Sequence, residues 1–532
     1  MEPIVKVTED FSITGQITVA DLGAIGAAGY RSVMCNRPDA EGDAEQTDFS
    51  EIASEAHTIG LHAAYLPVVL DQINAQDVYS FRQLLIDLPP PVLAYCRSGR
   101  RASTLFQLAQ DAASATLAAT DEKIVAQPVS HEVLIVGGGA GGIGVAASLL
   151  RREPGLQISI IEPSEQHYYQ PAWSLVGAGE FDIADTVRPT TSLIPGSVRW
   201  LKQCASSFDP ENQQLTLSDG STHCYQYLIV APGLKLYWAG IAGLEATLGS
   251  NGVTSNYRFD LAPYTWSLVQ TLRSGRAIFT QPAMPIKCAG APQKALYLSC
   301  SYWEAQGVLS NISVEFDNAG GALFGVAAFV PALMRYIERY KANLQFNSNL
   351  VAVDGPARKA WFDVKDSNGQ TSRVEKTFDF LHVVPPQVPH DVIKASRLGN
   401  VDGWVEVDQK TLQHVRYPTI FGLGDACSTP NAKTVAAVRK QIVVVAENLL
   451  ALRQQHALIT EYDGYGACPL TVEIGKVVLA EFGYGGKLLP TFPIDPTVAR
   501  RSAWVLKKNL LPAIYWQLML KGREWLARSG KV

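Results

Sequence analysis

The feature that most constrains this fold is a glycine-rich turn directly after a buried strand. Residues 132–136, Glu-Val-Leu-Ile-Val, are a short apolar run of the kind that forms a parallel strand buried on both faces. Gly137, Gly139 and Gly142 follow in G-x-G-x-x-G spacing, and a helical stretch runs to Leu150. In this motif the glycines permit a tight turn, approach of a pyrophosphate to the backbone, and close packing of helix on strand. The sequence therefore predicts a dinucleotide-binding fold.

Later segments favour FAD as the dinucleotide. Residues 158–161 are the expected next strand, and Glu162 follows about twenty residues after Gly142, where an acid binds a ribose hydroxyl. A strand at 227–230 leads into Ala-Pro-Gly233, a turn that suits a flavin domain. A strand at 420–422 leads into Gly424-Asp425 and a helical pattern from 434 to 452, whose N-terminus would stabilise a reduced, anionic flavin.

A second glycine loop, which would hold a nicotinamide, is missing. Residues 276–294 keep a strand, a turn and a helical stretch but lack G-x-G-x-x-G, and Cys288 stands where phosphates would lie. Electrons are therefore not expected to come from NAD(P)H. A thiol at a helix N-terminus beside Lys287 and Lys294 is expected to have a lowered pKa and to be nucleophilic. A buried structural cysteine is the alternative.

Composition narrows the classes of protein. The 532 residues leave room for about three or four domains. Hydrophobic residues make up 47% and charged residues 18%, which excludes a mainly disordered chain. A net charge of -5 offers no basic surface for nucleic acid. The 8 cysteines show no CxxC or Cys/His ligand spacing, so we expect neither a disulfide scaffold nor a metal site.

Five motifs together resemble one family. Residues 131 to about 528 resemble a sulfide:quinone oxidoreductase of the eukaryote-like type, through the segments 167–179, 287–294, 411–418, 430–434 and 462–465. The resemblance implies FAD, a pair of redox cysteines bridged by sulfur at the flavin, and a quinone pocket reached from the membrane. Beside the glycine motif and Glu162, the expected cofactor residues are Gln170, Pro171, Gly233, Gly424, Asp425, Lys433 and Thr434.

The resemblance makes Cys288 one member of the redox pair. The family's second cysteine directly follows the Gly-Asp pair, but here Ala426 stands there and Cys427 comes next. Cys427 is still the expected partner, because no other cysteine lies near that strand end. Cys300 would lie ~18 Å from Cys288 along the following helix. The remaining downstream cysteines, Cys204, Cys224 and Cys468, carry no motif support as redox thiols.

The expected activity is FAD-dependent oxidation of sulfide to a persulfide or sulfane sulfur, with electrons passed to a membrane quinone. Sulfide would attack a Cys288–Cys427 disulfide or trisulfide, and a small thiol, sulfite or further sulfide would accept the sulfur. Lys287 and Lys433 are candidates for polarising quinone or stabilising thiolates, with solvated lysines as the alternative. Two other functions stay open: a flavin sulfide dehydrogenase with a cytochrome acceptor, and a non-catalytic sulfide or redox sensor.

A separate cysteine loop lies in the first hundred residues. Cys96 ends a strand and precedes a loop with three arginines and then a helical stretch, which together form an anion cradle and lower a thiol pKa. The loop is Cys-x4-Arg, ending at Arg101, and resembles that of rhodaneses, whereas the flanking sequence resembles a phosphatase-like domain found beside bacterial sulfur-metabolism enzymes. A sulfurtransferase or persulfide acceptor is expected; a phosphatase and a degenerate or regulatory domain are the alternatives.

The predicted fold class is α/β, with two Rossmann-like domains, a small N-terminal phosphatase-like domain and a C-terminal membrane-associating segment. The expected parts are a Cys-loop domain at 1–112, a linker at 113–130, an FAD domain at 131–245 and 376–455, a second Rossmann-like domain at 246–375, and a quinone and membrane region at 456–532.

The C-terminal thirty residues favour a lipid surface. Three tryptophans, other apolar side chains and four cations, Lys507, Lys508, Lys521 and Arg523, alternate as in an interfacial amphipathic segment. A helix packed on the body is the alternative.

No apolar run reaches the ~20 residues of a membrane span, and the N-terminus does not resemble a secretory signal. We expect a cytoplasmic protein, peripheral on the inner face of the bacterial cell membrane; a homo-oligomer is left open.

Overall fold

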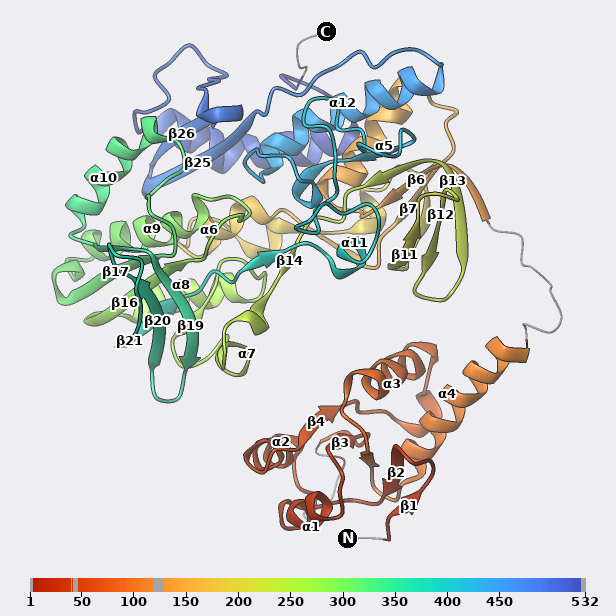
Figure 1. Cartoon of the computed structure of the whole chain (residues 1–532). Coiled ribbons are helices and arrows are strands. Elements are labelled where there is room, and N and C mark those ends of the chain that lie inside the picture. Colours follow the sequence, from red (N-terminus) through yellow and green to blue (C-terminus); the bar gives the residue numbers. More distant parts are fainter. Residues whose placement is uncertain (1–2, 40, 42–45, 119–128, 528–532) are drawn as a thin grey trace. The chain divides into compact units, whose positions relative to one another are not determined.

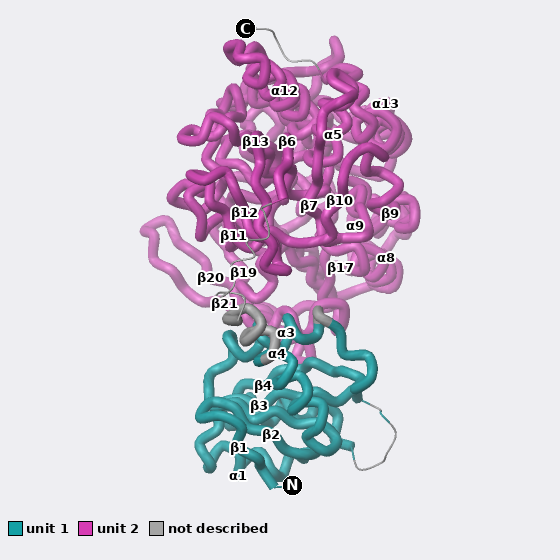
Figure 2. Tube along the Cα trace, turned by 90° about the vertical axis from the view of Figure 1, so that its right-hand side faces the viewer, with its two compact units in different colours: residues 1–127 teal, residues 128–532 magenta. Residues whose placement is uncertain are grey.

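The computed structural model describes residues 3–39, 41, 46–118 and 129–527. The chain divides into two compact units, residues 1–127 and 128–532 (Figure 2). The boundary between the units falls in the segment that was expected to be a linker, 113–130. Helix α4 (Arg100–Ala118) extends into that segment, and residues 119–128 lie outside the described part.

Unit 1 is a three-layer α/β fold. Its sheet has the order β1 (Val5–Lys6), β2 (Phe11–Thr14), β5 (Val92–Tyr95), β3 (Ser32–Cys35), β4 (His62–Tyr65), parallel except for β1. Side chains alternate between the two faces. Leu93 and Tyr95 pack with α1 (Leu22–Ala27) and α2 (Phe49–Thr58), whereas Val92 and Ala94 pack with α3 (Ala75–Asp87) and α4.

The first sheet of unit 2 carries the glycine motif. Its order is β10 (Arg199–Leu201), β7 (Ile158–Ile161), β6 (Val129–Val136), β13 (Thr222–Val230), β12 (Gln214–Leu217), β11 (Ala205–Asp209), and β24 (Ile420–Gly422) runs parallel to the end of β13. Helices α5 (Ala140–Arg152) and α12 (Val435–Arg453) pack together over it (Figure 1). The strands and helices expected here are confirmed.

A second parallel sheet lies further along the chain. Its order is β15 (Val253–Thr254), β22 (Phe380–His382), β16 (Gly275–Gln281), β17 (Ile312–Asn318), β18 (Asn343–Phe346). Helices α8 (Leu261–Thr271), α9 (Ala291–Ala305) and α10 (Val330–Arg339) contribute to its core. An antiparallel sheet, β19 (Ser348–Asp354), β20 (Lys359–Lys365) and β21 (Thr371–Thr377), adjoins it. The two sheets that the expected Rossmann-like domains need are therefore both present.

Short elements connect the two sheets. They are β8 (Gln166–Tyr168) paired with β9 (Val187–Pro189), β14 (Lys235–Leu236) paired with β23 (Gln387–Val388), and the single helical turns α6 (Trp173–Val176), α7 (Leu244–Thr247) and α11 (Asp391–Lys394).

The C-terminal region packs against both sheets. The hairpin β25 (Gly466–Glu473) and β26 (Lys476–Phe482) lies against α9. Helical turns follow, including α13 (Arg501–Val505) and α14 (Leu511–Ala513). Tyr515 and Trp516 are buried in the core of the first sheet. The C-terminal segment that the sequence predicts to face a lipid surface is therefore partly packed on the body of the protein. None of the described helices is long and apolar enough to cross a bilayer.

Candidate functional site

The glycine turn has the geometry that a dinucleotide needs. A Cβ added at Gly142 would lie 1.8 Å from the carbonyl oxygen of Gly137, and Gly137 itself has a φ of 101°. Both positions therefore accept only glycine. A Cβ at Gly139, in contrast, would meet nothing within 4 Å, so this side of the turn is open to a ligand. Gly233, with a φ of 79°, is equally open.

Glu162 lies where a ribose-binding acid is required. Its Oε2 accepts a hydrogen bond from the Gly138 N–H at 2.7 Å, and its Oε1 accepts one from the Ser164 N–H at 2.8 Å. The carboxylate is thus held at the end of β7, next to the glycine turn. These residues fit the adenosine half of FAD.

Polar groups from several elements meet at the other end of the cofactor site. The Lys287 ammonium lies 3.6 Å from an Asp425 carboxylate oxygen and donates to the Gln170 amide oxygen. The buried Lys433 Nζ donates to the carbonyl oxygens of Asp425 and Cys427, both at 2.8 Å. Both lysines are thus fixed by protein groups and are not simply solvated. Thr434 caps α12 by accepting from the Ala437 N–H.

The surroundings of Cys288 lower the pKa of its thiol. The Lys294 Nζ lies 3.1 Å from its Sγ. The pKa of Cys288 is held well below its usual value, first by a hydrogen bond from the Cys468 thiol, and then by the charges of Lys294 and Lys507, which outweigh its burial. Lys507 is buried itself, and burial lowers its pKa to about 7. The expected lowering of the Cys288 pKa and the contact with Lys294 are confirmed.

Cys427 lies in a different environment. It is fully buried in the core of the first sheet, and a Cβ added to Gly422 would meet its Sγ at 2.8 Å and the side chains of Val407 and Val405 at 3.0 and 3.1 Å. Burial raises the Cys427 pKa to about 12. After the turn at Asp425 the Cys427 side chain therefore packs in the core, whereas Cys468 acts on the pKa of Cys288. The expected Cys288–Cys427 pair stays a prediction.

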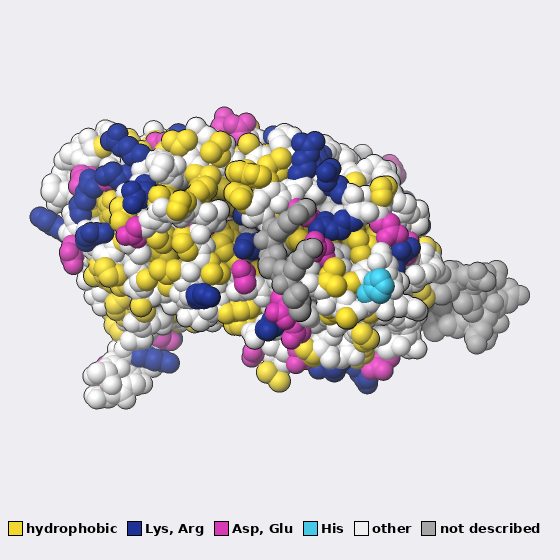
Figure 3. All heavy atoms as spheres, turned by 90° about the horizontal axis from the view of Figure 1, so that it is seen from above, with side chains coloured by type: hydrophobic (Ala, Val, Ile, Leu, Met, Phe, Trp, Pro, Cys, Tyr) yellow, Lys and Arg dark blue, Asp and Glu magenta, His cyan; other side chains and the backbone are white. Residues whose placement is uncertain are grey.

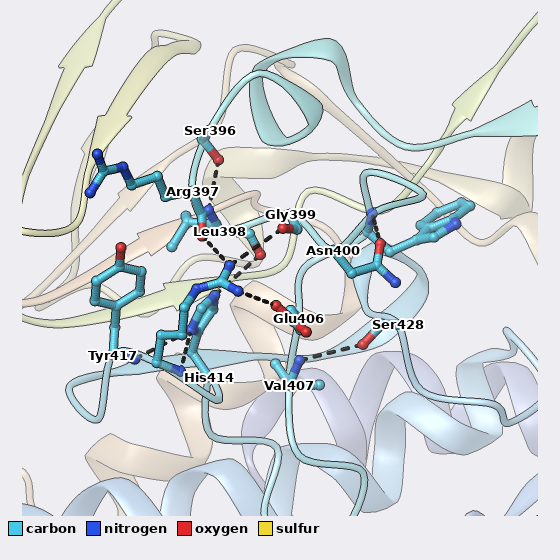
Figure 4. A network of polar contacts seen from close by, with 12 residues as sticks. Ser396, Arg397, Leu398, Gly399, Asn400, Glu406, Val407, His414, Tyr417 and Ser428 are labelled. Carbon is cyan, nitrogen blue, oxygen red and sulfur yellow. Dashed lines mark hydrogen bonds and ion pairs between the residues drawn. The ribbon is translucent and has the colours of Figure 1, made fainter.

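The segment 411–418 has a structural role next to Cys427. Figure 4 shows His414 inside a network of polar contacts. Its Nδ1 accepts from the N–H groups of Arg416 and Tyr417, and its Nε2 lies 3.2 Å from the Leu398 carbonyl oxygen. Burial lowers the His414 pKa, so the ring is neutral with its proton on Nε2. This network holds the loop whose Val405 and Val407 cover Cys427.

A cavity of about 280 Å³ lies beside Cys288. Its lining includes the cofactor candidates Gln170, Lys433 and Thr434, and also the apolar side chains Leu511, Ile514 and Trp525 of the C-terminal region. Asn256 lines it too, and among the described residues its buried amide has no hydrogen-bond partner. One cavity thus joins a reactive thiol, polar groups that suit a cofactor and an apolar wall.

Unit 1 holds its own cysteine loop. Cys96 is buried at the end of β5, Gly99 has a φ of 76°, and α4 begins at Arg100. Arg101 donates two hydrogen bonds to the Glu41 carboxylate, at 3.0 and 2.5 Å, and these bonds hold the pKa of Glu41 below its usual value. The loop and helix expected after Cys96 are confirmed. No sequence motif indicates that Arg101 pairs with Glu41.

The fold and the site define a dinucleotide-binding oxidoreductase with a reactive thiol. Residues 4–113 match the family model "Beta-lactamase hydrolase-like protein, phosphatase-like domain", and residues 131–283 match "Pyridine nucleotide-disulphide oxidoreductase". The mitochondrial sulfide:quinone oxidoreductase of Mus musculus is 38% identical over 392 residues, which are 74% of this chain and 87% of that protein. The Dictyostelium discoideum protein of the same name is 39% identical over 401 residues, 75% and 87% of the two chains.

A solved structure shares the fold. The sulfide:quinone oxidoreductase of the bacterium Aquifex aeolicus superposes with a TM-score of 0.61 at 20% identity, over 74% of this chain and 92% of that chain. The chain belongs to the sulfide:quinone oxidoreductase family. It is an FAD-dependent oxidoreductase that carries a phosphatase-like domain at its N-terminus.

Sequence reasoning missed two residues of the site. Lys507 was counted among the cations of a membrane-facing segment, yet it is buried near Cys288. Cys468 was set aside because no motif surrounds it. Neither has a local signal: Cys468 reaches the site because β25 packs on α9, and Lys507 is carried there by the helical segment between α13 and α14.

Proposed function

We propose that this chain oxidises sulfide at Cys288 and passes two electrons through FAD to a quinone. The observation that carries the proposal is one cavity that joins Cys288 to the cofactor candidates Gln170, Lys433 and Thr434 and to an apolar wall. The names of the family's relatives support the same pair of substrates.

The chain's own groups would act as follows. Sulfide attacks an S–S bond that includes Cys288, one cysteine keeps the added sulfur as a persulfide, and the other leaves as a thiolate. The ammonium of Lys294, 3.1 Å from Cys288 Sγ, stabilises the thiolate. Glu162 and the glycine turn would bind the adenosine half of FAD, and Lys287, Asp425 and Lys433 would surround its reactive end. Bound FAD supplies the two-electron acceptor between thiol and quinone. A small thiol, sulfite or sulfide then takes the sulfur.

The test is anaerobic reduction of a soluble ubiquinone analogue by sulfide. With Cys288→Ser the rate is expected to fall about 1000-fold or more, since the nucleophilic thiol is gone. Cys204→Ser, at an exposed cysteine, is the matched control and is expected to keep the wild-type rate. A Cys288→Ser protein with the full rate would refute the proposal. Reduction of a cytochrome in place of the quinone would favour the dehydrogenase alternative.

Association with a membrane surface is part of the proposal. Figure 3 shows hydrophobic side chains gathered on one face with lysines and arginines beside them. In the C-terminal region the exposed apolar residues include Phe492, Val505, Leu510, Trp525 and Leu526. Exposed cations from the same region, Lys521 and Arg523, would contact anionic headgroups. A quinone could then enter the cavity from the bilayer; the expected inner-face, bacterial location stays a prediction.

For unit 1 we propose sulfur transfer through Cys96. Cys96 precedes a left-handed Gly99 and the N-terminus of the long helix α4, the arrangement that stabilises a persulfide anion. In the full chain, sulfur transfer from thiosulfate to cyanide is expected to depend on Cys96, and Cys96→Ser should abolish it while quinone reduction continues. Sulfur transfer that survives Cys96→Ser would eliminate this role, and hydrolysis of an aryl phosphate that is lost in Cys96→Ser would favour the phosphatase.

A further inference from the structure

Cys468 lies beside the reactive thiol although no motif marks it. It is fully buried in β25, in the core cluster against which Cys288 packs. The segments that carry the two cysteines are in close contact: a Cβ added to Gly290 would lie 2.1 Å from Cδ2 of Leu470. The two thiols also act on each other: Cys468 lowers the pKa of Cys288, and Cys288 raises the pKa of Cys468. Two cysteines on segments packed this closely are candidates for an S–S bond.

The contacts of Cys427 differ in kind. Lys433 contacts both residues through their main chains: the Cys288 N–H donates to the Lys433 carbonyl at 2.9 Å, and the Lys433 Nζ donates to the Cys427 carbonyl. The Cys427 Sγ points to Gly422 and Val407 in the other core cluster. The family's cysteine position itself is filled by Ala426, which is also buried.

We infer that Cys288 and Cys468 form the redox-active pair of this chain and that Cys427 is a core residue. The inference rests on the proposed sulfide oxidation and names the second cysteine of that reaction. It also explains how a chain with alanine at the family's cysteine position can keep a dithiol site: the second sulfur atom comes from β25 in place of the turn after β24.

The chemistry balances with this pair. Hydrosulfide attacks Cys288, which lines the cavity, whereas Cys468 is fully buried. The S–S bond breaks, Cys288 carries the persulfide, and Cys468 leaves with the electron pair and takes the proton. An acceptor thiol, sulfite or sulfide removes the outer sulfur, which leaves a Cys288 thiolate beside a Cys468 thiol. Forming the S–S bond again releases two electrons and one proton; a flavin is the oxidant, and quinone reoxidises it.

Peptide mapping tests the pair directly. The purified holoenzyme is oxidised either with diamide or by turnover with sulfide and a quinone analogue, blocked with N-ethylmaleimide, and digested without reductant. Mass spectrometry is expected to find the Cys288 peptide joined to the Cys468 peptide, with the mass of a disulfide or of one extra sulfur. A Cys288 peptide joined to the Cys427 peptide, or found unjoined, would overturn the inference.

Variants give a second readout. Cys468→Ser is expected to lose the cross-link, and quinone reduction should fall about 100-fold or more at unchanged flavin content. Cys427→Ala is expected to keep the Cys288–Cys468 link. Full activity of Cys468→Ser would overturn the inference while leaving the proposed function intact. If diamide forms the Cys288–Cys468 bond in a wild-type protein that does not reduce quinone with sulfide, the proposed function fails and the pair stands.

Discussion

Cys288 combines a strained backbone with a stabilised charge. Its φ is 51°, in the left-handed region that non-glycine residues rarely adopt and that often marks functional sites. Hydrogen bonds hold it there on both sides: its N–H donates to the Lys433 carbonyl, and its carbonyl accepts from the Ala291 N–H at 2.7 Å. The backbone therefore positions Sγ beside the Lys294 ammonium, which favours the negatively charged form of the thiol.

At the scale of the residue, the first prediction concerns Lys294. Because the Cys288 pKa is well below the ordinary value of 9.0, its alkylation by iodoacetamide should change little between about pH 7.5 and 9, where an ordinary thiol reacts faster as pH rises. Lys294→Met removes the cation beside Cys288 Sγ, should raise the Cys288 pKa, and should slow alkylation near neutral pH.

Alkylation kinetics followed by mass spectrometry of the Cys288 peptide measure this pKa. Lys341→Met, at a surface lysine on α10's C-terminal side, is the matched control and should leave the profile unchanged. A wild-type rate that rises tenfold per pH unit up to pH 9 would contradict the thiolate assignment.

At the scale of the element, the glycine turn between β6 and α5 connects the cofactor site to the C-terminal region. The His167 Nδ1 donates to the Gly138 carbonyl, and its Nε2 accepts from the Tyr515 hydroxyl at 2.6 Å, while burial lowers its pKa to about 4. Arg152 of α5 bonds Glu524 and Glu447. The C-terminal turns are therefore fixed against the dinucleotide-binding unit.

The second prediction tests this element. Gly142→Ala would place a methyl group 1.8 Å from the Gly137 carbonyl oxygen, so α5 cannot pack on β6 and bound FAD should fall below about a tenth of the wild-type content. Gly155→Ala is the matched control, because a Cβ there meets nothing within 4 Å. Flavin absorbance per mole of protein measures both. A Gly142→Ala protein with full flavin content would show that this turn does not hold the cofactor.

At the scale of the whole molecule, the C-terminal region would serve two purposes at once. Its buried side chains complete the thiol site, and its exposed side chains, Leu510 and Trp525 among them, offer an apolar surface beside the cavity. An enzyme that exchanges an apolar substrate with a bilayer benefits from this arrangement, since the substrate need not cross water.

The third prediction concerns that surface. The double substitution Val505→Asp and Leu510→Asp should lower binding to vesicles of anionic phospholipid about tenfold, because two exposed apolar side chains outside the cavity lining are lost and negative charge is added. Reduction of a short-chain, soluble quinone should change far less. Val401→Asp, at a fully exposed valine in another loop, is the matched control. Co-sedimentation measures binding, and equal binding of all three proteins would exclude this surface as the membrane contact.

The sequence by itself determined the local elements and their chemistry. The apolar run 132–136, the spacing of Gly137, Gly139 and Gly142, and Glu162 predict the cofactor unit because strand, turn and helix are adjacent in the chain. Cys288 and Lys294 can be found from the sequence for the same reason, because both lie within about one helical turn of the start of α9 at Ala291. Only the tertiary structure showed that Cys468 and Lys507 act on the pKa of Cys288. Cys468 and Lys507 arrive from a hairpin and a turn far along the chain, and side-chain direction after Asp425 depends on packing that no motif records.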